Sequence, residues 1–177
     1  DHPTREVLIR AALTLLETLH PEELTLDKVL VASGVSKGSL YHQFADLNAL
    51  IDEALLLDFG RGVYADIRAI THLTNQVDSK MGLARGLRLI TQISQDPALK
   101  HRRLRRASLI LRAQLDKEFS EKLIVIQRDL SNALSELILK AQDKGWMIET
   151  FSPAAGATLV QAYSLGRLVG QIAGDDL

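Results

Sequence analysis

Cysteine is absent from the 177-residue sequence. Its absence excludes disulfide bonds, thiolate metal sites and thiol catalysis, and it fits a reducing cytoplasm, where we expect the protein to work. No apolar run reaches the length that a membrane-spanning helix needs, and no signal peptide is visible. With 46% hydrophobic and 24% charged residues, the chain still has enough apolar side chains for a core.

The patterns of common enzyme sites are also missing. No G-x-S-x-G, P-loop, G-x-G-x-x-G or H-E-x-x-H motif occurs in the sequence. None of the five histidines stands four positions from another, so no two of them could hold a metal ion from one face of a helix. We therefore expect no enzyme, no cofactor and no metal site.

Proline is scarce: the sequence has four, each where a helix could begin or be interrupted. No stretch alternates apolar and polar residues as a strand does, so we predict an all-α fold. Between Ala98 and Lys144 no glycine or proline marks a break. The spacing of apolar residues predicts helices at residues 7–19, 26–32, 37–44, 47–70, 81–93 and 119–141, with others beginning at Pro97 and Pro153.

The sequence does contain a helix-turn-helix pattern around ASGVSKGSLYHQF, residues 32–44. Thr25 can cap the helix before the turn, Gly34 supplies the left-handed residue that ends it, and Ser36 can cap the next helix. Units of this kind place their second helix in the major groove of DNA. We therefore predict a three-helix domain in residues 1–46, joined by a fourth helix to a larger helical domain in residues 47–177.

The segment after the turn has the side chains of a recognition helix. Lys37 can donate to guanine acceptors, Ser39 can pair with several base edges, and Gly38 lets the backbone approach the bases. Leu40 and Phe44, four residues apart, are predicted to face inward. Three further side chains can donate to phosphate oxygens, which fix the register on DNA: Tyr41, His42 and Gln43. A short connector helix with ordinary polar residues fits the same composition, because helix-turn-helix geometry also occurs without DNA.

Residues 4–55 resemble the N-terminal domain of TetR-type (TetR/AcrR-like) transcriptional regulators. The resemblance implies a homodimeric DNA-binding repressor whose helical C-terminal domain binds a small-molecule inducer. It also implies that Thr25 meets a phosphate, that Lys37, Gly38, Ser39 and Tyr41 are recognition positions, and that His42 and Gln43 contact the DNA backbone. Ser36, at the cap of the recognition helix, is predicted to contact DNA as well. The residues that carry the resemblance are Ala11, Ala12, Leu15, Leu16, Thr25, the ASGVSKGSLYHQF segment and Leu50.

The chain departs from the family pattern at several positions. Pro21 stands where the family usually has glycine, and His42-Gln43 stand where Tyr-His is usual. Leu47 replaces a lysine that commonly meets DNA phosphate, so we expect one contact to be lost. Residues 1–50 carry four basic and seven acidic side chains, a net charge of −3. Because non-specific affinity comes mostly from phosphate neutralisation, we expect weak binding to non-operator DNA. A basic arm before Asp1 would change that balance.

Small residues recur every fourth position in the last predicted helix, and they end with Gly170 and Gly174. Such a stripe lets another helix come close, either within the same chain or from a second subunit. In the resembling family, the last two long helices of each subunit form a four-helix bundle across a two-fold axis, and here these helices would be at about residues 117–144 and 153–173. The predicted dimer interface comprises Leu130, Leu134, Leu137, Thr158, Ala162, Gly166 and Gly170.

The resemblance places the inducer pocket between the fourth helix and the helices at about residues 80–95 and 103–115. The run KHRRLRR, from Lys100 to Arg106, has no acidic residue. It fits a solvated face, as charge runs usually do, or a site for an anionic ligand such as an acyl-CoA. The candidate pocket positions, each of which also fits plain core, are Phe59, Val63, Leu87, Ile90, Ser108 and Leu111.

The predicted function is therefore a cytoplasmic, homodimeric regulator that a small-molecule inducer releases from a palindromic operator. The alternative is an adaptor of the same fold that regulates through protein contacts instead of DNA. The acidic balance of residues 1–50 and the leucine at position 47 favour that alternative.

Overall fold

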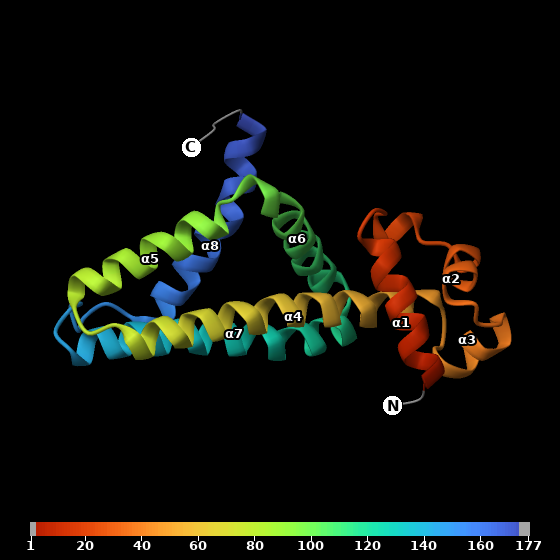
Figure 1. Ribbon diagram of the computed structural model, residues 1–177, viewed down its shortest axis with the longest axis horizontal. Helices are drawn as coiled ribbons and strands as arrows, with labels where there is room; N and C mark the ends of the chain where they lie inside the picture. The colour runs from red at the N-terminus through yellow and green to blue at the C-terminus, as the bar shows by residue number, and fades with distance from the viewer. Residues whose placement is uncertain (1–2, 174–177) are drawn as a thin grey trace. The chain divides into compact units, whose positions relative to one another are not determined.

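The computed structural model describes residues 3–173 (Figure 1). This part of the chain forms eight α-helices and two short 3-10 helices and contains no strand, which confirms the all-α prediction. The predicted small residue at position 174 lies outside the described residues. The elements are α1 (Pro3–Leu16), η1 (Pro21–Glu23), α2 (Leu26–Ser33), α3 (Lys37–Gln43), α4 (Leu47–Gln76), α5 (Lys80–Ser94), η2 (Pro97–Leu99), α6 (Lys100–Leu115), α7 (Lys117–Asp143) and α8 (Pro153–Ala173).

The chain divides into two compact units, one up to Arg61 and one from Gly62 onward. The division falls inside α4, whereas the sequence prediction placed a domain boundary after residue 46. Leu50, Ala54 and Leu55, all buried, explain why the first unit extends beyond that point: the start of α4 contributes to its core.

Apolar side chains at helical spacing form the core of the first unit. Leu8 and Ala12 stand one turn apart on α1 and are fully buried, as are Val29 on α2 and Leu50 on α4. Leu40 of α3 is also fully buried, and the ring of nearby Phe44 is only 5% exposed. The prediction that these two residues of the third helix face inward is therefore confirmed.

The first helix ends at Leu16, three residues before the predicted end. The backbone N–H groups of Glu17 and Thr18 donate to carbonyls three residues back, which tightens the last turn. Pro21 then opens the 3-10 helix η1, and Glu23 accepts a 2.8 Å hydrogen bond from the backbone of His20. The proline therefore begins a new element as well as following the end of an old one.

In the second unit, α7 lies beside both α4 and α8 (Figure 1). Tyr64 donates to Asp129, and Lys140 donates to Asn75; both pairs are separated by 65 residues, so the two helices run in the same direction. α8 runs antiparallel to α7 and approaches it closely at Gly156, where an added Cβ would lie 2.5 Å from Ile138. No helix among the described residues is long and apolar enough to cross a membrane.

Asp116 separates α6 from α7 in a stretch that has no glycine or proline to mark a break. Its carboxylate accepts a 3.0 Å hydrogen bond from the backbone N–H of Phe119 and so caps α7. Phe119 is then buried, and leucines at helical spacing continue the core along α7.

Candidate functional site

The helix-turn-helix is built by three local interactions. Thr25 caps α2 by accepting a hydrogen bond from the backbone N–H of Lys28, at 3.4 Å. Gly34 ends α2 with φ of +67°, a left-handed conformation that glycine adopts without a steric penalty. Ser36 caps α3 by accepting from the backbone N–H of Ser39, at 3.2 Å. The capping roles that the sequence predicted for these residues are confirmed.

The polar side chains of α3 lie on the surface of the first unit. Lys37, Gly38 and His42 are exposed, and Tyr41 is 46% exposed. A Cβ added at Gly38 would meet no atom within 4 Å, so no other described part of the chain covers this position of the first turn. α3 thus presents a donor-rich face of the kind that can enter a groove of DNA.

The remaining predicted DNA contacts are partly engaged within the chain. Ser39 is half-buried, and its hydroxyl lies 2.9 Å from that of Ser36. Gln43 is half-buried at the end of α3, whereas Thr25 is exposed at the start of α2. The structure therefore gathers all eight predicted DNA-contact positions into the first unit, on α2, α3 and the caps of these helices.

Arg5 on α1, which the sequence analysis did not single out, holds the end of the recognition helix. Its guanidinium forms an ion pair with Glu53 of α4 and donates a 2.8 Å hydrogen bond to the carbonyl of Gln43. It also lies over the ring of Phe44, 4.4 Å from the centroid. One side chain thereby joins α1, the last turn of α3 and α4. No local sequence pattern reveals it, since its partners lie 38 and 48 residues away.

Besides Thr25, the family pattern has a phosphate contact at the start of α4. Asp46 caps this helix by accepting a 2.8 Å hydrogen bond from the backbone N–H of Ala49. Leu47 is the first residue of α4 and is half-buried. A lysine side chain at this position could reach solvent and a phosphate, whereas leucine offers no donor.

The six candidate pocket residues lie in different environments. Phe59 belongs to the first unit, and Val63 is a buried residue of the second. Leu87 and Ile90 are half-buried on α5. Ser108 is exposed on α6, and Leu111, one turn further along the same face, is 63% exposed. In the single chain, the two α6 positions therefore face away from the core.

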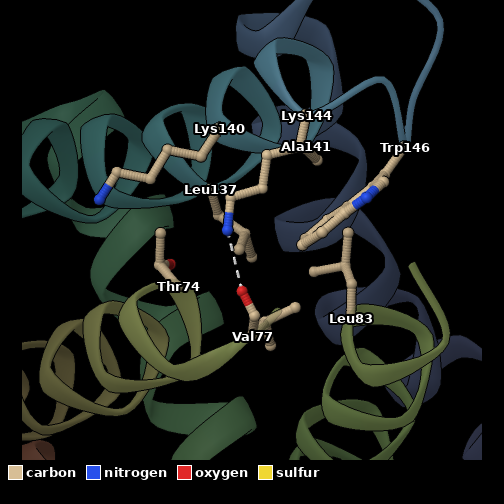
Figure 2. A pocket seen from close by; sticks show the side chains of 8 residues that line it. All are labelled: Thr74, Val77, Leu83, Leu137, Lys140, Ala141, Lys144 and Trp146. Carbon is tan, nitrogen blue, oxygen red and sulfur yellow. Dashed lines mark hydrogen bonds between the residues drawn. The ribbon is translucent and has the colours of Figure 1, made fainter. Parts of the chain in front are cut away.

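A small cavity in the second unit is lined by a different set of residues (Figure 2). It lies between the ends of α4 and α7 and the start of α5, with Trp146 beside Leu83. Lys144 spans its edge, donating a 3.0 Å hydrogen bond to the carbonyl of Val77. Its volume of about 10 Å³ is enough for one water molecule and not for an inducer. None of the six predicted pocket residues lines it.

The predicted interface residues separate into two groups. Leu130, Leu134 and Leu137 of α7 are 4 to 7% exposed in the single chain, so they belong to its own core and offer no free surface to a partner. The predicted role of these leucines is corrected accordingly. On α8, Thr158, Ala162 and Gly166 are exposed and Gly170 is half-buried.

No model of a known protein family matches the sequence, and no curated protein matches it. Solved structures do match the fold over nearly the whole chain. A protein assigned to the TetR family of transcriptional regulators, from Mesorhizobium loti, is 20% identical with a TM-score of 0.66; the match covers 88% of this chain and 75% of that one.

Two further structures give similar values. The regulatory protein TetR from Rhodobacter sphaeroides is 21% identical with a TM-score of 0.64, and the match covers 97% of this chain and 90% of that one. The reduced form of NemR from E. coli is 18% identical with a TM-score of 0.66, and the match covers 97% of this chain and 89% of that one.

These matches define a class of protein: an all-helical chain with an N-terminal helix-turn-helix and a larger helical unit. Many of the structural neighbours are TetR-family transcriptional regulators, and the chain has the fold of that family.

Proposed function

We propose that the protein is a homodimeric transcriptional repressor that binds a palindromic operator and leaves it when a small-molecule ligand binds the second unit. The observation that carries the proposal is α3: a capped helix, exposed on its first turn, with Lys37 and Ser39 where base edges would lie. A connector helix would need neither the exposed donors nor the open space at Gly38.

An exposed face of α8 supports the proposed dimer. Leu159, Tyr163 and Val169 are 64%, 56% and 70% exposed, and they flank the small residues Ala162 and Gly166. A Cβ added at Gly166 would meet nothing within 4 Å, so none of residues 3–173 fills the space at this glycine. An apolar face around small residues suits a helix from a second subunit.

Release by a ligand would use α4, because this helix belongs to both units. A ligand that binds one conformation of the second unit more tightly would bias α4, and α4 is tied through Glu53 and Arg5 to the end of α3. By reciprocity, operator DNA must weaken ligand binding by the same factor as the ligand weakens DNA binding.

Selection of bound sequences from random DNA duplexes tests the proposed DNA binding. A dimer should enrich a palindrome whose half-sites lie roughly 34 to 36 Å apart, one turn of the double helix. Lys37→Ala protein serves as the matched control and should enrich a degenerate motif at the same half-site spacing. If no motif is enriched even at low salt, the proposal is wrong.

An adaptor that acts through protein contacts is the second candidate. The acidic balance of residues 1–50 favours it, and so does Val31 of α2, which is 85% exposed beside the turn. A protein partner would cover this valine, whereas phosphates would not attract the acidic side chains. The affinity of the protein for its partner is measured at 50 and at 200 mM salt, roughly the range over which affinity for DNA falls steeply. An affinity that does not change over this range would favour the adaptor.

A further inference from the structure

His42 stands in the middle of the exposed face of α3. Successive helical residues are turned by about 100°, so the point opposite the buried Leu40 lies between Gly38 and His42, which are one turn apart. Both residues are exposed, and a Cβ added at Gly38 would meet no atom within 4 Å. The imidazole therefore belongs to the surface that α3 would present to a groove of DNA, and there is open space one turn before it.

The charge of an imidazole changes near neutral pH. In water this group takes up a proton at about pH 6.5 and then donates from both ring nitrogens, whereas in the neutral ring one nitrogen donates and the other accepts. Lys37 is the other basic residue of α3, and the helix has no acidic residue. A proton on His42 therefore gives this helix a second positive charge.

The N-terminal part of the chain has little positive charge with which to attract DNA. Residues 1–50 have a net charge of −3 while their histidines are neutral, and Leu47 offers no donor where the resembling family commonly has a lysine. Because each cation that meets a phosphate adds to DNA affinity, a protonated His42 would offset part of this deficit.

The charged groups that the structure places at the end of α3 are engaged with one another or with the backbone. Arg5 of α1 forms an ion pair with Glu53 of α4 and donates to the carbonyl of Gln43. The carboxylate of Asp46 caps α4. No hydrogen bond or ion pair joins the His42 side chain to another of residues 3–173, so its ring nitrogens are available to DNA.

We propose that His42 contacts the operator through its protonated imidazole, so that operator affinity rises as the pH falls. The acceptor is a guanine edge or a phosphate oxygen, each of which offers lone pairs to an N–H donor. The inference rests on the proposed function, because it adds a form of regulation to the same DNA-binding surface.

The direction of the pH effect follows from linkage. DNA binds the charged imidazole more tightly than the neutral one, so the complex keeps the proton to a higher pH than the free protein does. The added affinity is therefore fully present below about pH 6 and is lost as the pH rises toward about 8.

Fluorescence anisotropy with the selected operator, at constant ionic strength and from about pH 5.5 to 8.5, tests the inference. A dimer has one His42 in each half-site, so we expect operator affinity to be about tenfold higher at pH 6 than at pH 8. His42→Gln keeps an N–H donor that does not titrate, and His42→Lys keeps a cation throughout this range. Both variants should lose most of the change with pH. His20→Gln removes another exposed histidine of the first unit and should keep the whole change.

The dependence on DNA sequence identifies the acceptor. An equal gain in affinity on the operator and on an unrelated duplex, as the pH is lowered, identifies a phosphate, whereas a gain on the operator alone identifies a base. The guanines of the half-site are then replaced one at a time by 7-deazaguanine, which lacks the N7 acceptor. The replacement that abolishes the gain marks the base that His42 contacts.

The inference is overturned if wild type and His42→Gln respond alike to pH, or if the response is lost in His20→Gln and kept in His42→Gln. Because His42 is exposed, its variants should stay folded, and urea melts at both pH values check this. A protein that binds its operator equally well at every pH contradicts only this inference. A protein that enriches no DNA sequence at any pH contradicts the proposed repressor function itself.

Discussion

Arg5 contacts three groups around the end of the recognition helix: Glu53, the Gln43 carbonyl and the Phe44 ring. Arg5→Lys keeps the charge but loses the planar guanidinium that contacts Glu53, the Gln43 carbonyl and the Phe44 ring together. We expect operator affinity to fall more than the cost in folding stability explains, because the end of α3 is no longer fixed. Fluorescence anisotropy with operator DNA, alongside a urea melt, measures both quantities.

Arg10 supplies the control for that experiment. It is exposed on the same helix, so Arg10→Lys should leave both affinity and stability within about 0.5 kcal/mol of the wild-type values. If Arg5→Lys lowers stability and leaves operator affinity unchanged, Arg5 supports the fold and does not position α3.

The side chains of α3 should divide by the part of DNA that they contact. Lys37→Ala and Ser39→Ala should each cost about 1–3 kcal/mol on the operator and relax preference at one or two base pairs. Tyr41→Phe and Gln43→Ala should instead weaken binding to all sequences more evenly. Competition between operator and point-mutated duplexes measures the difference, and identical behaviour of the two pairs would contradict this division.

Single residues also mark the limit of prediction from sequence. Gly34 and Ser36 were predictable because each acts on its own backbone neighbourhood, through a left-handed φ or a cap. Arg5 was not predictable, since its role depends on partners that only the tertiary fold brings within reach. The basic run at the start of α6 left two interpretations open, because the sequence does not reveal that Arg103 is buried.

At the scale of an element, the first turn of α4 offers a gain-of-function test. Leu47→Lys places a cation at the position where the resembling family commonly has a phosphate contact. We expect tighter binding to every duplex. The slope of log affinity against log salt concentration should also steepen by nearly the amount that one more phosphate contact contributes. Affinity measured from 50 to 200 mM salt gives the slope, and Asn48→Lys, exposed one position further along, controls for added charge alone. The same slope in Leu47→Lys and wild type would show that Leu47 does not face a phosphate.

Helix boundaries followed the sequence where proline, glycine or a capping residue stood in an obvious place. α8 begins at Pro153, as predicted, and extends to Ala173, the last residue that the structure describes. No proline or glycine marks the boundary between α6 and α7, and only the family resemblance predicted helices at about residues 103–115 and 117–144 on its two sides. A lone aspartate caps a helix only when the chain before it has already turned, and that turn depends on packing.

At the scale of the whole molecule, the sequence predicted that α8 has a stripe of small residues but could not say which partner it meets. The structure shows two faces of that helix. Gly156 and Ala157 are buried toward α7, while Ala162 and Gly166 are exposed. The leucines of α7 were assigned to the wrong partner because burial within a chain and burial between chains produce the same apolar spacing.

Substitutions at two glycines of α8, Gly166 and Gly156, therefore test whether the exposed face of this helix forms the proposed dimer interface. Gly166→Leu adds bulk where the single chain has open space, so it should separate the subunits and leave each one helical. Operator binding should then fail, because one half-site offers too few contacts.

Gly156→Leu adds the same side chain where Ile138 and Phe151 already fill the space. It should lower stability by about 1–3 kcal/mol through overpacking and leave the dimer intact wherever the protein remains folded. Sedimentation velocity and thermal melts of the two variants distinguish these outcomes, and a Gly166→Leu protein that stays dimeric would place the subunit interface on another face.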